Sequence, residues 1–227
     1  MAVIVLASGS AGASTSAKKY APDIDPAGFS TVIDHPYLPL TPGSRWVYES
    51  QTPEGLERIV VEVTDDTREV MGVETVVVRD TVTLDGVVIE DTFDWYAQDA
   101  EGNVWYFGED TREFENGIAV NASGAWEAGI DGALPGIVME ADPQVGDRYR
   151  QEYYEGEAED EGKVLSLDAT VTVPFGDFDG VLQTKDFTRL ERGVVENKFY
   201  AEGVGVVQEQ KVKGGSQLTV LVEHTTR

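Results

Sequence analysis

The sequence predicts an all-β protein, with helix as a minor component at most, in which one antiparallel meander curls into a half-barrel or a barrel. From Arg45 onward, apolar and polar residues alternate with a period of two over many short runs, as in half-buried strands. Turn signals separate these runs, and no amphipathic helix is present that could connect parallel strands. The length of 227 residues fits one domain of this class.

The expected strands follow one another along the chain with short connections. Asp85-Gly86 is the strongest hairpin signal, because both residues tolerate the positive φ angles of a two-residue turn. Gly193 and Gly214-Gly215 mark tight turns near the C-terminus. The expected strands are 45–51, 57–64, 73–84, 87–98 and 103–110 before the middle of the chain, and 149–155, 164–173, 181–190, 194–201, 204–213 and 217–224 after it.

Three segments lie outside these strands. Residues 1–17 hold a short apolar run followed by Ala11-Gly12-Ala13, which predicts the remnant of a signal peptide or a disordered leader. Residues 18–44 contain five prolines and are expected to form an extended lead-in to a β domain over 45–227. Residues 115–147 are rich in Gly and Ala and contain Trp126. We expect this segment to be a lid or a long loop, packed across or beside the concavity of the sheet.

The composition excludes several classes of partner and site. Lys and Arg number 17 against 42 Asp and Glu, so the net charge of −25 repels nucleic acid and anionic lipid. The absence of cysteine excludes disulfides, thiolate metal sites and a cysteine nucleophile within these 227 residues, and we expect no acylated cysteine anchor. No run of 18 apolar residues predicts a transmembrane span. The acidic residues are spread along the chain, which is typical of a solvated surface or of cation binding.

Three stretches carry a resemblance to known proteins. They are HPYLPLTPGSRWVYES (His35 to Ser50), DWYAQDAEGNVWYFGE (Asp94 to Glu109) and KFYAEGVGVVQEQ (Lys198 to Gln210). Together they resemble an uncharacterised group of exported bacterial proteins. The third stretch also resembles a tail of secreted proteins with the LolA-like half-barrel fold of lipoprotein carriers. The resemblance implies a half-barrel with a hydrophobic concavity and implies no catalytic residues.

Aromatic residues are the candidates for binding a ligand in such a concavity. Cavities in curved sheets are lined mainly by apolar and aromatic side chains. The predicted ligand-binding residues are Trp46, Trp95, Trp105, Tyr106 and Trp126.

Strand register suggests a candidate metal site. A two-residue turn at Asp85-Gly86 places Asp80 opposite Asp91, and a four-residue loop at 99–102 places Asp91 opposite Asp110. Carboxylates opposite each other destabilise a sheet unless a cation, an arginine, a proton or water compensates them. Asp80, Asp91 and Asp110 are therefore the predicted ligands of calcium, the one possible cofactor. The alternatives are pairing with Arg68 or Arg189, or a position at an open, wet rim.

The leading functional hypothesis is a non-enzymatic protein, secreted or periplasmic, that binds a small or lipid-like ligand in the concavity of its sheet. A calcium-dependent structural or interaction module of the cell surface is the alternative. A hydrolase that uses paired carboxylates such as Asp80 and Asp91 is the least favoured class. The two histidines, His35 and His224, are far apart in the sequence and match no catalytic motif.

Overall fold

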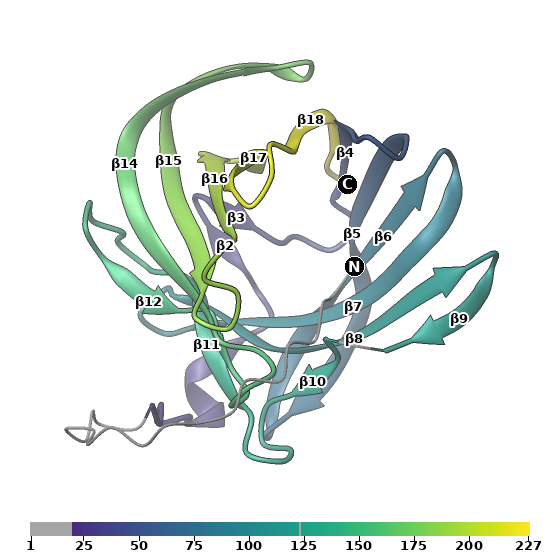
Figure 1. The fold of residues 1–227 in the computed structure, drawn as a ribbon. Coiled ribbons are helices and arrows are strands. Elements are labelled where there is room, and N and C mark those ends of the chain that lie inside the picture. The colour runs from purple at the N-terminus through teal and green to yellow at the C-terminus, as the bar shows by residue number, and fades with distance from the viewer. Residues whose placement is uncertain (1–19, 123) are drawn as a thin grey trace, which may run out of the picture.

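The computed structural model describes residues 20–122 and 124–227 (Figure 1). The apolar run and the Ala11-Gly12-Ala13 motif lie outside the described residues. Within the described chain, no helix is long and apolar enough to cross a membrane.

Strands dominate the molecule. One short 3-10 turn, η1 (Pro26–Gly28), precedes them, and the Asp25 side chain accepts a hydrogen bond from the Ala27 amide at its start. The strands are β1 (Phe29–Ser30), β2 (Asp34–His35), β3 (Leu38–Pro39), β4 (Arg45–Gln51), β5 (Leu56–Val70), β6 (Val73–Leu84), β7 (Val87–Asp99), β8 (Val104–Glu115), β9 (Ile118–Asn121), β10 (Trp126–Glu127), β11 (Leu134–Met139), β12 (Arg148–Arg150), β13 (Glu152–Tyr153), β14 (Asp160–Val173), β15 (Gly176–Thr188), β16 (Val195–Ala201), β17 (Gly205–Lys213) and β18 (Leu218–Thr225).

Among the described residues, sixteen of these strands join one antiparallel sheet. Its main path runs β12-β14-β15-β16-β17-β18-β4-β5-β6-β7-β8-β11-β13, so most neighbours in the sheet are also neighbours in sequence. The prediction of one antiparallel meander curled into a half-barrel or a barrel is thus confirmed. Asp85 and Gly86 form the tight turn that was predicted, with φ angles of 48° and 82°.

Two sets of strand pairings bring the path round into a barrel. The last strand, β18, pairs with β4, the first long strand, as shown by the register of Leu221 with Tyr48. The second set involves the closing segment, residues 148–153. Its first half, β12, pairs with β14, whereas its second half, β13, pairs with β11. The two ends of the path therefore meet in one short segment, and the sheet is nearly closed (Figure 1).

The closing segment is packed tightly against β11. A Cβ atom added at Gly136 would lie 2.4 Å from the carbonyl carbon of Gln151, so only glycine allows this approach. Tyr149 covers Gly162 of β14 in a similar way, with its ring 2.5 Å from the Cβ position. Small residues at these two points let the chain complete the wall of the barrel.

Residues 115–147 form part of this wall. β9, β10 and β11 all pair with β8. We expected residues 115–147 to lie either across the concavity or beside it, and this pairing places them beside it. The segment does contribute one side chain, Val138, to the interior cavity.

The proline-rich residues 20–44 run along the barrel and cover part of its outer face. Phe29 pairs with Asp99 of β7, and its ring makes edge contacts with Phe107 at 5.5 Å and Trp105 at 6.0 Å between centroids. The β2–β3 hairpin lies further along, where Leu38 reaches the interior. The strand residues form two apolar clusters. One lies inside the barrel. The other, the outer apolar cluster, includes the residues of the outer face that these segments cover, and it extends to Tyr106 and Trp126.

Candidate functional site

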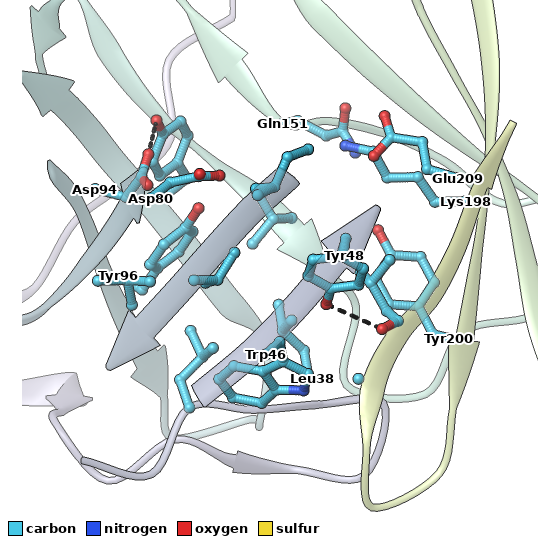
Figure 2. Close-up of a pocket in the computed structure, with 18 of the residues that line it drawn as sticks. Leu38, Trp46, Tyr48, Asp80, Asp94, Tyr96, Gln151, Lys198, Tyr200 and Glu209 are labelled. Atoms are coloured by element: carbon cyan, nitrogen blue, oxygen red, sulfur yellow. Dashed lines mark hydrogen bonds between the residues drawn. The ribbon is translucent and has the colours of Figure 1, made fainter. Parts of the chain in front are cut away.

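The barrel encloses a cavity of about 360 Å³. β3 to β8 and β16 to β18 supply most of its wall, together with the closing segment (Figure 2). Its apolar lining comprises Leu38, Leu40, Trp46, Ile59, Val61, Val78, Val138 and Val206. Its polar lining comprises Tyr48, Asp80, Asp94, Tyr96, Tyr106, Gln151, Glu152, Asp160, Lys198, Tyr200, Glu209 and Thr219. The cavity is therefore amphipathic.

Hydrogen bonds to the backbone of β17 and its preceding turn hold the apolar part in place. The indole Nε1 of Trp46 donates to the carbonyl oxygen of Val204 at 2.7 Å. The Tyr48 hydroxyl donates to the carbonyl oxygen of Val206 at 3.0 Å. Since both donors are satisfied by the protein, their rings present carbon faces to the cavity without leaving a buried polar atom unpaired.

Two carboxyl groups, Asp80 and Asp94, lie together at one side of the cavity (Figure 2). The Tyr106 hydroxyl donates to Asp94 Oδ1 at 2.7 Å, and the rings of Tyr96 and Tyr106 stack with centroids 4.9 Å apart. Asp80 Oδ1 is buried and has no hydrogen-bond partner in the described chain. This pair of acids therefore lacks the full set of donors that buried carboxylates normally have.

A basic group, Lys198, lies at another side of the cavity with Glu209 (Figure 2). Its Nζ is 3.4 Å from Asp186 Oδ2. The carboxylate of Glu209, followed by that of Asp186, holds the pKa of Lys198 well above its usual range and outweighs the opposing effect of burial. The Lys198 side chain lines the cavity and is 31% exposed. Among the described residues that line the cavity, Lys198 is the one basic side chain.

Burial raises the pKa of the lining carboxyls. It raises the pKa of Asp80 to about 7, assisted by the negative charge of Glu90, and that of Glu152 to about 8, assisted by Asp160. The pKa of Asp94 lies well above its ordinary value, again because of burial and then of the nearby Glu109. Several acids of the cavity consequently bind protons near neutral pH, which lowers the repulsion among them.

Three of the five predicted ligand-binding residues lie at or beside the cavity. Trp46 and Tyr106 line it. Trp126 is 5% exposed and packs edge-on against Tyr106 with ring centroids 5.4 Å apart, so it lies beside a residue of the cavity wall.

The prediction that Trp95 and Trp105 line the cavity is wrong. Both belong to the outer apolar cluster, where Arg68 lies over the Trp95 ring and Trp105 donates to Asp99 Oδ2 at 2.7 Å. Side chains alternate between the faces of a strand, so Tyr96 and Tyr106 point inward and the tryptophan before each of them points outward.

The predicted row of Asp80, Asp91 and Asp110 is also wrong, because both hairpins differ in register from the expectation. A bulge at Ile89 moves Asp80 opposite Thr92. The next hairpin turns at residues 100–102, where the Asp99 amide donates a hydrogen bond to the Asn103 carbonyl oxygen at 2.9 Å. A bulge follows near Gly108. Each one-residue change reverses the face that a side chain occupies.

The three acids consequently have separate surroundings. Asp91 accepts two hydrogen bonds from Arg79, at 2.7 and 3.0 Å, so an arginine compensates its charge, although it is neither of the two expected. Asp110 lies opposite Phe93 and contacts Arg112 at 3.3 Å. Asp80 alone of the three lines the cavity. Within residues 20–122 and 124–227, no three His, Cys, Asp or Glu side chains gather as metal ligands.

Sequence reasoning missed most of the cavity lining, including the polar residues Asp94, Tyr96, Lys198 and Glu209. The bulges change which face of the sheet Asp94 and Tyr96 occupy, so alternation alone did not predict that they point inward. Lys198 and Tyr200 alternate across β16 with Phe199, and a lysine that shares a face with a buried tyrosine is the one signal that could have identified this part of the site.

The fold and the cavity define an antiparallel β-barrel protein with an acidic, amphipathic interior. No family model matches the chain, and no curated protein matches its sequence. Among solved structures, the chain is similar to the crystal structure of a putative lipoprotein from Parabacteroides distasonis ATCC 8503. The two share 13% sequence identity over 83% of this chain and 98% of that chain, with a TM-score of 0.47.

Proposed function

We propose that this chain is an extracytoplasmic, non-enzymatic protein that binds one small amphipathic ligand inside its barrel. The observation that carries the proposal is the cavity of about 360 Å³, which the surrounding side chains leave unfilled. Pockets for small ligands typically measure about 300–1,000 Å³ and combine apolar walls with a few polar groups. The resemblance to exported proteins with a LolA-like fold supports both the hydrophobic interior and the location.

Retention of a ligand tests the proposal most directly. Native mass spectrometry of the full chain, purified from its own host, should show an added mass that disappears on denaturation. The emptied protein should then bind the neutral apolar dye Nile red, because dye transferred from water to the cavity buries apolar surface.

A matched pair of variants locates the binding. Val61 is partly buried on β5 and lines the cavity, whereas Val120 on β9 is 51% exposed. Val61→Trp should fill part of the cavity and weaken dye binding at least about ten-fold, and Val120→Trp should leave it unchanged. Equal binding by both variants would place the dye outside the barrel and overturn the proposal.

A further inference from the structure

One row across the sheet joins the apolar and acidic parts of the cavity. Trp46 of β4 lies opposite Val61 of β5, and Val61 lies opposite Asp80 of β6. All three line the cavity. Adjacent strands are about 4.8 Å apart, so the Trp46 and Asp80 backbones are separated by about 10 Å. Asp94 lies diagonally from Asp80, since its direct partner on β6 is Val78. The row therefore runs from an indole through a valine to a pair of acids.

We propose that the ligand carries an ammonium group, which binds between Asp80 and Asp94 while its apolar body lies along Val61 and Trp46. This inference rests on the proposed function and adds the chemical class of the ligand. The unpartnered Oδ1 of Asp80 lacks a donor that an ammonium group would supply. The neighbouring ring of Tyr96 offers a face to a cation, because aromatic rings are negative above their planes.

The acidic and basic groups around the cavity favour a cationic ligand over an anionic one, most strongly above about pH 7, where Asp80 is ionised. Five carboxyl-bearing residues line it, namely Asp80, Asp94, Glu152, Asp160 and Glu209, against the single Lys198. Lys198 is already held by Asp186 and Glu209, away from the Asp80 side (Figure 2). An anionic ligand would have to compete with those acids for one lysine. A metal ion finds too few ligands, since no three suitable side chains gather in the described chain.

The surroundings of Asp80 make this binding depend on pH. Burial disfavours its ionised form most, and the negative charges of Glu90 on β7, Glu209 on β17, Glu109 on β8 and Asp91 on β7 add to this effect. Asp80 therefore loses its proton only near pH 7. An alkyl ammonium stays protonated up to about pH 10. Affinity for the amine should consequently rise between about pH 5.5 and pH 8, as Asp80 ionises.

Three probes of equal length and different head groups test the inference: decylamine, decanol and decanoate. Isothermal titration of the full chain at pH 8 should give the tightest binding for decylamine, by about ten-fold over decanol, and the weakest for decanoate. Asp80→Asn should remove most of the amine's advantage over decanol. Asp110→Asn is the matched control, because it makes the same charge change on a residue that does not line the cavity, and it should behave as the wild type.

The outcomes separate this inference from the proposed function. If decanol binds as tightly as decylamine, or if decanoate binds best, the ammonium site is refuted and the ligand-binding function stands. An amine advantage that survives Asp80→Asn also refutes the site. If no probe binds, and no ligand is retained from the host, the proposed function fails together with this inference.

Discussion

Replacing Asp80 by asparagine should stabilise the protein, and more at high pH than at low pH. The carboxyl is held in the cavity wall without a partner for Oδ1, and its pKa rises from 3.8 to about 7. Each pKa unit corresponds to about 1.36 kcal/mol, so ionised Asp80 costs the folded state about 4 kcal/mol. Water in the cavity screens part of this cost. We therefore expect Asp80→Asn to gain about 2–4 kcal/mol at pH 8.

The sign follows from proton binding in the two states. Because the folded pKa of Asp80 exceeds the unfolded one, the folded state binds more protons between about pH 4 and pH 7. The stabilising effect of the protonated carboxyl is complete below the unfolded pKa and is lost as the pH rises through the folded pKa. At pH 5 folded Asp80 is still protonated, so the gain from asparagine should be less than half of that at pH 8.

Urea denaturation at pH 5 and pH 8 measures both gains. The wild type, Asp80→Asn and the control Asp110→Asn are compared at each pH, and the free energy of unfolding is extrapolated to water. Subtracting the wild type removes the contribution of the other buried acids, such as Glu152, which change stability in the same direction. A gain that is equal at the two pH values, or a loss at pH 8, would show that Asp80 titrates normally, and the reasoning would be refuted.

Three further predictions concern the wall of the barrel and its acids. Trp126→Ala should lower the free energy of unfolding by about 3–5 kcal/mol in urea denaturation, because removal of the buried indole leaves a cavity beside Tyr106. A small loss of stability with much weaker ligand binding would instead give Trp126 a direct role as a lid. Gly136→Ala should cost about 1–3 kcal/mol in the same assay, since its Cβ would overlap the Gln151 backbone, and Gly193→Ala, which has open space, should be nearly neutral. Calcium at millimolar concentration should shift the melting temperature of the wild type and of Asp91→Asn by less than about 1 °C, because Arg79 occupies both oxygens of Asp91; a rise in the wild type alone would contradict the observed pairing.

The architecture could be predicted because its signals are local. Alternation identifies each strand, and Asp85-Gly86 identifies a turn whose geometry few other residue pairs accept. Antiparallel neighbours then follow from short connections. The closing segment could not be predicted, since its two halves pair with strands that come before and after it in sequence and the pairing depends on contacts over the whole barrel.

The candidate site was predicted only in part, because its residues depend on register. Trp46 and Asp80 were placed on the inner face correctly, since no bulge separates them from their partners on β5. Trp95 was predicted on the inner face, but Asp94 lies there instead. The bulge at Ile89 and the three-residue turn after Asp99 each shift the pairing by one residue. A bulge leaves little trace in the alternation of a short strand, so these errors arise where the chain departs from regular pairing.

The pairing of β18 with β4 has a consequence for how this chain acquires its structure. Leu221 pairs with Tyr48, so the first long strand has one free edge until nearly the whole chain has been synthesised. Contacts between residues this far apart in sequence make folding slow, because a large loop must close before they form. A polypeptide that cannot complete its sheet early stays unfolded during synthesis and can still pass through a membrane channel. Late closure therefore suits the export that we propose, in which the chain crosses a membrane before it folds.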